Sequence, residues 1–404
     1  MEKEGSYHTI REVWSPVQVL HFENNAFTIK NCYNFTNLKD CQFGYRLLNM
    51  PEYGSTAVKV IKKGKLASPN VAPGEETKLK IENTNADVIE LTAIDPAGKE
   101  IFTWSHNTKT GSFNKLYLKE NTQKYSYTEN DNQLTIQNGS CQYLFSKKTG
   151  MLMGVNVNGK KLSFCNGPRF VAAKRSDRSD DGFYNHDDKE AFNKKTQYTE
   201  YPDQGAFDGF TFSDSALVAN YLHGSVNTVI WHFLADGRVY LNVDYYFNGV
   251  VDLMGICFDY PETMLKSKQW VGNGPYRVWQ NRMEGSQYGF WHNDYNDPIP
   301  GESWEYPEFK GYFANVDWMK LNTSEGTIGI MPSPAMQQPA YIGVYTPRDG
   351  RDHLLYELPE TGISILNVIP AVRNKVNATD LNGPSAQPYW SKGKGNIDAI
   401  LRFD

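Results

Sequence analysis

The chain has 404 residues, a length that predicts two or three domains rather than one core. Hydrophobic residues make up 40% and aromatic residues 14%, so the chain can bury large cores and is not composed like a disordered protein. A formal net charge of −5 argues against a nucleic-acid partner, because binding phosphate requires a basic surface. No run of about 18 apolar residues occurs, so the sequence predicts no membrane partner.

The first hundred residues alternate in the short period of β-strands. In FTIKNCYNF, residues 27–35, the side chains of Phe27, Ile29, Tyr33 and Phe35 are predicted to share one side of a strand. About seven such strand candidates precede residue 118, which suits an immunoglobulin-like sandwich. We therefore predict an immunoglobulin-like β-sandwich over residues 1–118.

A second meander of short strands is predicted over residues 124–404. In VYLNVDYYF, residues 239–247, every second side chain from Val239 to Phe247 is apolar, which is typical of a half-buried antiparallel strand. Turn sequences such as VNGKK, residues 157–161, separate these strands. An all-β segment of this length predicts large stacked sheets, so the fold class expected for the whole chain is all-β.

An acidic, turn-rich stretch follows residue 173. Its oxygen-bearing side chains have nearly the spacing of a calcium-binding loop, the ligands being Asp177, Ser179, Asp181, Asn185 and Asp188. A serine third ligand, an aspartate in the last position and the lack of flanking helices make calcium the weaker alternative. We predict instead a loop without a cofactor, in which Arg175, Asp177 and Asp181 face a neighbouring domain or a substrate.

Aromatic and basic residues gather further along the chain. Trp279, Trp291 and Trp304 lie in polar sequence within about thirty residues, and Arg282 lies among them. Exposed, these aromatic faces would form a stacking platform for sugars; buried, they would be part of a β-sandwich core. We take these four residues as candidates for carbohydrate binding or for contact with another domain.

Several phrases resemble family 2 glycoside hydrolases of the beta-galactosidase type. MGVNVNGKKLSFCNGPRF, residues 153–170, resembles the strand-turn-strand opening of the last domain of that family. WVGNGPYRVWQNRMEGSQYGFW, residues 270–291, resembles its Trp-x-Gly-x-Gly-Pro signature. EKEGSYHTIREVWSPVQV, residues 2–19, resembles the exit from the family's catalytic barrel into an immunoglobulin-like domain. The resemblance spans nearly the whole chain.

The resemblance implies an immunoglobulin-like domain followed by a super-sandwich similar to galactose mutarotase. In the family, the two catalytic glutamates lie on a (β/α)₈ barrel, so the implied chain is a non-catalytic C-terminal fragment that packs on this barrel and completes its active-site region. The implied parent is a glycosidase, and the implied partners are its barrel and carbohydrate. Ile363 and Ser364 stand where relatives place an aromatic side chain near the substrate, so the resemblance does not fix the preferred sugar.

Other function classes stay open at this point. A stand-alone carbohydrate-binding β-sandwich protein is the main alternative, and a polysaccharide lyase or a mutarotase fits less well. The start, MEKEGSYHTI, lacks the apolar core of a signal peptide. The sequence therefore fixes no compartment, although a signal peptide on the parent would place it in the periplasm or outside the cell.

Overall fold

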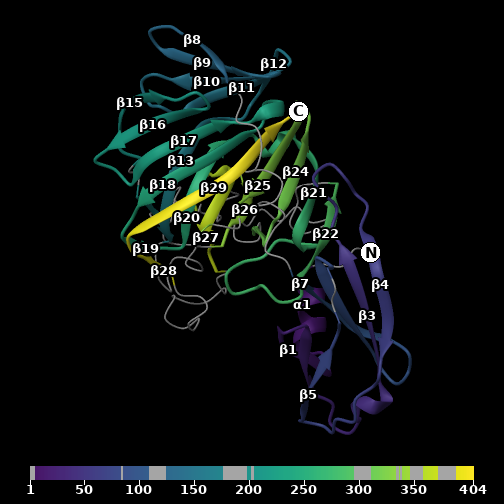
Figure 1. The fold of residues 1–404 in the computed structure, drawn as a ribbon. Coiled ribbons are helices and arrows are strands. Elements are labelled where there is room, and N and C mark those ends of the chain that lie inside the picture. The colour runs from purple at the N-terminus through teal and green to yellow at the C-terminus, as the bar shows by residue number, and fades with distance from the viewer. Residues whose placement is uncertain are drawn as a thin grey trace. The chain divides into compact units, whose positions relative to one another are not determined.

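The computed structural model of the chain is almost entirely β-structure (Figure 1). It describes residues 5–82, 85–108, 124–175, 198–201, 204–294, 311–333, 336, 339–345, 358–371 and 388–404. Within these ranges the helical elements are α1 (Gly5–Val13) and the short 3₁₀ turns η1 (Leu38–Asp40), η2 (Ala235–Gly237) and η3 (Glu262–Met264). No helix in this described part is long and apolar enough to cross a membrane.

The chain divides into two compact units. The N-terminal unit combines Met1–Thr110 with two later segments, Val271–Tyr276 and Met283–Trp291, and the remaining residues form the second unit. The predicted boundary between residues 1–118 and 124–404 falls outside the described residues. These linear domain bounds therefore stay a prediction.

The N-terminal unit is an immunoglobulin-like sandwich of two antiparallel sheets. One has the order β1 (Val17–Glu23), β2 (Ala26–Asn31), β5 (Glu76–Lys80), and the other has the order β4 (Lys59–Leu66), β3 (Gln42–Asn49), β6 (Val88–Ile94), β7 (Glu100–Asn107). Phe27 and Ile29 from the first sheet and Phe43, Leu91 and Trp104 from the second are buried in one core. The fold-class prediction for this unit is confirmed.

One detail of the predicted strand at residues 27–35 is wrong. The strand β2 ends at Asn31, and Phe35 is 98% exposed rather than buried beside Phe27. The Asn31 side chain explains the ending, because its amide donates to the carbonyls of Thr36 and Val71, and its oxygen accepts from the Tyr33 amide. These bonds replace the backbone ladder and turn the chain away from the sheet.

Two large sheets carry the strands of the second unit, and the nine-stranded one also includes the end of β21 (Leu265–Gly274) and most of β22 (Gln287–Asn293), which belong to the N-terminal unit. The eleven-stranded sheet has the order β23 (Phe313–Ala314), β26 (Tyr341–Tyr345), β27 (Gly362–Val368), β20 (Leu253–Asp259), β13 (Cys165–Arg175), β11 (Leu152–Val157), β10 (Cys141–Ser146), β9 (Gln133–Asn138), β8 (Ser126–Glu129), with β12 (Lys160–Leu162) beside β11 and β14 (Tyr198–Glu200) beside β13. The nine-stranded sheet has the order β15 (Ala206–Phe212), β16 (Ala216–Leu222), β17 (Val226–Phe233), β18 (Val239–Tyr246), β29 (Lys394–Phe403), β25 (Thr327–Pro332), β24 (Trp318–Thr323), β21 (Leu265–Gly274), β22 (Gln287–Asn293). A two-stranded sheet pairs β19 (Gly249–Val251) with β28 (Tyr389–Ser391).

Aromatic side chains fill the space between the two large sheets. Trp231 of β17 is fully buried, and its ring lies 5.2 Å from that of Phe145 on β10 and 6.4 Å from that of Phe258 on β20. Tyr143 of β10 packs in the same way on Phe233 of β17. The two sheets therefore face one another and share one core, which confirms the predicted super-sandwich.

Two local predictions are confirmed by the strands themselves. On β18, Val239, Leu241, Val243 and Tyr245 are buried, whereas the side chains between them are partly or fully exposed. The VNGKK sequence forms a two-residue hairpin between β11 and β12, with Val157 opposite Lys160. Asn158 and Gly159 take φ angles of +50° and +78°, the left-handed conformation that this hairpin turn requires. In Figure 1 the yellow strand β29 lies between β18 and β25, at the centre of the nine-stranded sheet.

Candidate functional site

Arg175 is the last residue of β13 and is buried in the second unit. Its guanidinium Nη2 lies 3.3 Å from Oδ1 of Asp252, and its backbone N–H donates to Oδ2 of Asp252 at 2.8 Å. The side chain of Asp252 is only 4% exposed. Arg175 is therefore anchored inside the sandwich at the point where β13 ends, and its predicted contact with a substrate or domain stays a prediction.

Two further cations lie buried in the same unit. Arg277 donates to the carbonyl of Val344 at 3.3 Å, and Lys268 donates to Oδ1 of Asn293 at 3.2 Å. Both cations approach the ring of Phe313, at 5.2 Å and 5.8 Å. Their positions on β21 and just after it were not predicted as part of a site.

Tyr312 interacts electrostatically with two of the buried cations, Arg175 and Arg277. Burial raises the pKa of the Tyr312 hydroxyl, and the charges of Arg175 and Arg277 act in the opposite direction. Asp252, the partner of Arg175, does have a signal in the sequence. It is an aspartate within the apolar run VVDLMG, residues 250–255, and a buried acid needs a counter-ion.

Trp279 and Arg282 are brought together by a tight turn. Their backbones exchange hydrogen bonds, with the Arg282 N–H donating to the Trp279 carbonyl at 3.0 Å, and the guanidinium lies 5.8 Å from the indole ring. Trp279 is 8% exposed, whereas Arg282 is exposed. The arginine thus covers an enclosed ring, and the sugar contact predicted for this pair stays a prediction.

Three of the predicted site residues lie outside the described residues: Asp177, Asp181 and Trp304. The same holds for the alternative calcium ligands Ser179, Asn185 and Asp188, so the calcium reading stays untested. Across the described ranges, no group of three or more His, Cys, Asp or Glu side chains could hold a metal ion.

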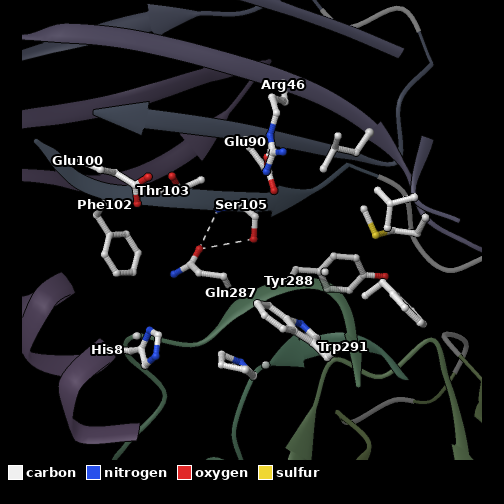
Figure 2. Close-up of a pocket in the computed structure, with 18 of the residues that line it drawn as sticks. His8, Arg46, Glu90, Glu100, Phe102, Thr103, Ser105, Gln287, Tyr288 and Trp291 are labelled. Carbon is white, nitrogen blue, oxygen red and sulfur yellow. Dashed lines mark hydrogen bonds and ion pairs between the residues drawn. The ribbon is translucent and has the colours of Figure 1, made fainter. Parts of the chain in front are cut away.

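A pocket of about 550 Å³ lies within the N-terminal unit, and Trp291 lines it. Figure 2 shows the sheet residues Arg46, Glu90, Thr103 and Ser105 on one side of this pocket and Gln287, Tyr288 and Trp291 on the other. Its lining therefore combines strands β3, β6 and β7 of the sandwich with strand β22 from much later in the chain. Of the four predicted site residues that the structure describes, Arg175, Trp279, Arg282 and Trp291, it is Trp291 that lines this pocket.

The polar side of the pocket is built from ion pairs. Arg46 Nε donates to Oε2 of Glu90 at 2.5 Å, and these residues lie opposite one another on β3 and β6. Nη2 of Arg11, on α1, lies 3.4 Å from Oε1 of Glu100 at the start of β7. The opposed register on neighbouring strands explains the first pair, because cross-strand partners of opposite charge attract one another.

Gln287 lines the pocket, and its side chain is held by hydrogen bonds. Its side-chain oxygen accepts from the backbone N–H of Ser105 at 2.8 Å, and its amide donates to Oε1 of Glu12 at 3.2 Å. Glu12 also accepts a hydrogen bond from the backbone N–H of Gly285. Burial raises the pKa of Glu12, and these two hydrogen bonds partly offset that rise. The amide of Gln287 is thus held in one orientation beside the pocket.

These observations define an all-β protein in which an immunoglobulin-like sandwich is followed in sequence by a super-sandwich. Residues 137–368 match the family model described as beta galactosidase small chain, and residues 27–107 match the model described as beta-galactosidase, domain 4. The first match spans more than half of the sequence, and the chain belongs to the beta galactosidase small chain family. The resemblance to the C-terminal region of a beta-galactosidase-type enzyme is thereby confirmed.

Solved structures share only a distant likeness with the chain. One is the crystal structure of HI1317, with 8% sequence identity and a TM-score of 0.30, covering 71% of this chain and 98% of that one. Another is a candidate mutarotase, YeaD, from Salmonella typhimurium, with 9% identity and a TM-score of 0.30, covering 72% of this chain and 98% of that one. At these TM-scores neither likeness carries an argument about function. None of the curated proteins compared with the chain matches it significantly.

Proposed function

We propose that this chain is the non-catalytic C-terminal region of a family 2 glycoside hydrolase of the beta-galactosidase type. In this proposal it packs on a (β/α)₈ barrel, which carries the catalytic glutamates, and completes the active-site region of that barrel. The observation that carries the proposal is the order of the two family matches. A domain 4 match at residues 27–107 is followed by a small-chain match at residues 137–368.

The same matches support the proposed partner. A small chain, by that name, belongs with a larger chain, and a domain 4 belongs with the domains that precede it in a beta-galactosidase. The barrel is therefore supplied either by another part of the same polypeptide or by a second polypeptide. Carbohydrate enters the proposal as the substrate held by that barrel.

The carboxylates of the pocket support a non-catalytic role. Glycosidases place their two carboxylates about 5 Å apart for retention, or about 6.5–9.5 Å apart for inversion. Glu90 on β6 lies opposite Ser105 of β7, and Glu100 lies five residues before Ser105 on that strand. At about 3.3 Å per residue, the Cα atoms of the two glutamates are separated by roughly 16 Å along the strand direction. This backbone separation gives no support for assigning the pair either of the glycosidase distances.

The expected activity of the purified chain alone is background hydrolysis. Nitrophenyl galactoside, glucuronide and mannoside should all be hydrolysed no faster than in buffer, because in this proposal the two catalytic carboxylates lie on the barrel. The measurement is release of nitrophenol by the repurified chain. Turnover that survives repurification and is lost in the Glu90→Gln or Asp181→Ala variant would overturn the non-catalytic assignment.

A further inference from the structure

We propose that the pocket of the N-terminal unit is a binding site for a neutral saccharide, with Trp291 as the face on which a pyranose ring stacks. This site lies entirely within residues of one unit and includes none of the residues predicted from the acidic loop. It does not depend on the proposed barrel, and nothing in the proposed function assigns it a ligand.

The size of the pocket suits a small saccharide. Ligand-binding pockets commonly measure about 300–1,000 Å³ and combine apolar and aromatic walls with a few fixed polar groups. This one measures about 550 Å³, and Phe102, Tyr288, Phe290 and Trp291 supply aromatic surface. Leu48, Met50, Val58 and Val60 add an aliphatic wall. The lining thus offers the apolar contact area that the C–H face of a sugar ring requires.

Trp291 lies flat because a glycine leaves room beneath it. A Cβ atom added to Gly274 on β21 would lie 2.5 Å from Cγ of the Trp291 ring, a distance too short for any real side chain. A Cβ atom on Gly289 would also reach the ring, at 3.4 Å. The indole N–H donates to the carbonyl of Gly272 at 3.0 Å, which fixes the ring against the strands. Figure 2 shows Trp291 on the side of the pocket across from Arg46 and Ser105, where its ring forms part of the lining.

The charges of the pocket favour a ligand without net charge. Arg46 pairs with Glu90, and Arg11 pairs with Glu100, so the two cations are matched by two carboxylates. An anionic sugar would have to approach both glutamates, and a cationic ligand would approach both arginines. A neutral hydroxyl can accept from a guanidinium and donate to the adjacent carboxylate, so a paired Arg46 and Glu90 can bind neighbouring hydroxyl groups.

Gln287 adds a donor at a fixed place. Its oxygen is committed to Ser105 and one amide hydrogen points to Glu12, so the amide cannot rotate without breaking both bonds. An amide nitrogen carries two hydrogens, and the second remains for a ligand hydroxyl. The pocket thus combines a ring for stacking, Trp291, with a charged pair and a fixed amide that can bind hydroxyl groups. This combination fits a neutral pyranoside better than a ligand that is only apolar.

The test is calorimetric titration of the full chain with lactose, cellobiose and maltose, and with galacturonic acid as the charged comparison. We expect at least one neutral disaccharide to bind, and the Trp291→Ala variant to weaken that binding roughly tenfold or more, as loss of a central aromatic anchor does. The Gly274→Ala variant keeps the tryptophan but displaces its ring, so it should weaken binding as well. The matched control is Trp390→Ala, which removes a tryptophan that is 64% exposed on β28 of the other unit and should leave affinity unchanged.

A second pair of variants covers the case in which Trp291→Ala does not fold. Arg46→Met keeps the aliphatic stem and Glu90→Gln keeps the shape, and each should weaken binding of the same disaccharide while the melting temperature stays close to that of the parent chain. The proposal is overturned if none of the neutral sugars binds, if only the acidic sugar binds, or if Trp390→Ala rather than Trp291→Ala removes binding. None of these outcomes affects whether the chain associates with a barrel, which is measured separately and without sugar binding as the readout.

Discussion

Replacing Asp252 with alanine is expected to lower the free energy of unfolding of the second unit by about 3–5 kcal/mol, the usual cost of removing one partner from a buried ion pair. Asp252 accepts hydrogen bonds from both the backbone and the guanidinium of Arg175, and both side chains are almost fully buried. Alanine would leave the cation without this counter-ion and the backbone N–H without this acceptor. Urea-induced unfolding followed by tryptophan fluorescence measures the loss.

The matched control for Asp252→Ala is Glu129→Ala, which breaks a pair in the same unit. Lys147 and Glu129 lie closer together, at 2.8 Å, but their side chains are 34% and 50% exposed. Exposed pairs contribute at most about 1 kcal/mol, so this variant should unfold almost as the parent chain does. Asp252→Asn, which can still accept from the Arg175 backbone, should fall between the two. Equal effects of Asp252→Ala and Glu129→Ala would show that burial of the pair does not matter.

A loss of similar size is expected for Trp231→Ala. The ring of Trp231 is fully buried between the two large sheets, against Phe145 and Phe258, and large-to-alanine changes of this kind cost about 3–5 kcal/mol. Its indole N–H has no hydrogen-bond acceptor among the described residues. Trp231→Phe should therefore cost much less, because it keeps most of the aromatic volume and removes a buried donor that makes no bond.

Thermal and urea unfolding of the two Trp231 variants distinguish packing from hydrogen bonding. If the core between the sheets is packed as described, the alanine variant unfolds at much lower urea and the phenylalanine variant stays near the parent. Two variants with the same small effect would mean that Trp231 does not join the sheets. Two variants with the same large effect would mean that the N–H makes a bond.

The sequence predicts the local structure well where alternation and turn chemistry agree. On β18 the apolar positions are two residues apart, and such a pattern buries one face in only one register. Asn158-Gly159 predicts its hairpin because both residues tolerate positive φ angles. The pattern fails at Phe35, where the side chain of Asn31 ends the strand through bonds that alternation cannot reveal.

The pocket could not be assembled from sequence spacing. Its lining runs from His8 to Trp291, and the strand that carries Gln287 and Trp291 joins a unit built mostly from the first hundred residues. The polar residues around Trp291 in the sequence did mark it as a candidate binding residue. The space that Gly274 gives its ring, however, depends on how β21 and β22 lie together, which no local pattern encodes. Sequence spacing also fails to predict the environment of Arg175. Its place in a charged run suggested exposure, but the side chain is buried and contacts Asp252, which lies far along the chain.

If the proposed function is right, this chain completes the catalytic barrel of a parent enzyme. The experiment mixes the purified chain with a separately produced polypeptide that carries the (β/α)₈ barrel of the parent enzyme. Co-elution on gel filtration and hydrolysis of nitrophenyl galactoside are both measured. We expect the two to co-elute and the mixture to hydrolyse the substrate well above the sum of the separate activities. Separate elution with no gain in hydrolysis, or full activity of the barrel polypeptide alone, would contradict the proposed function.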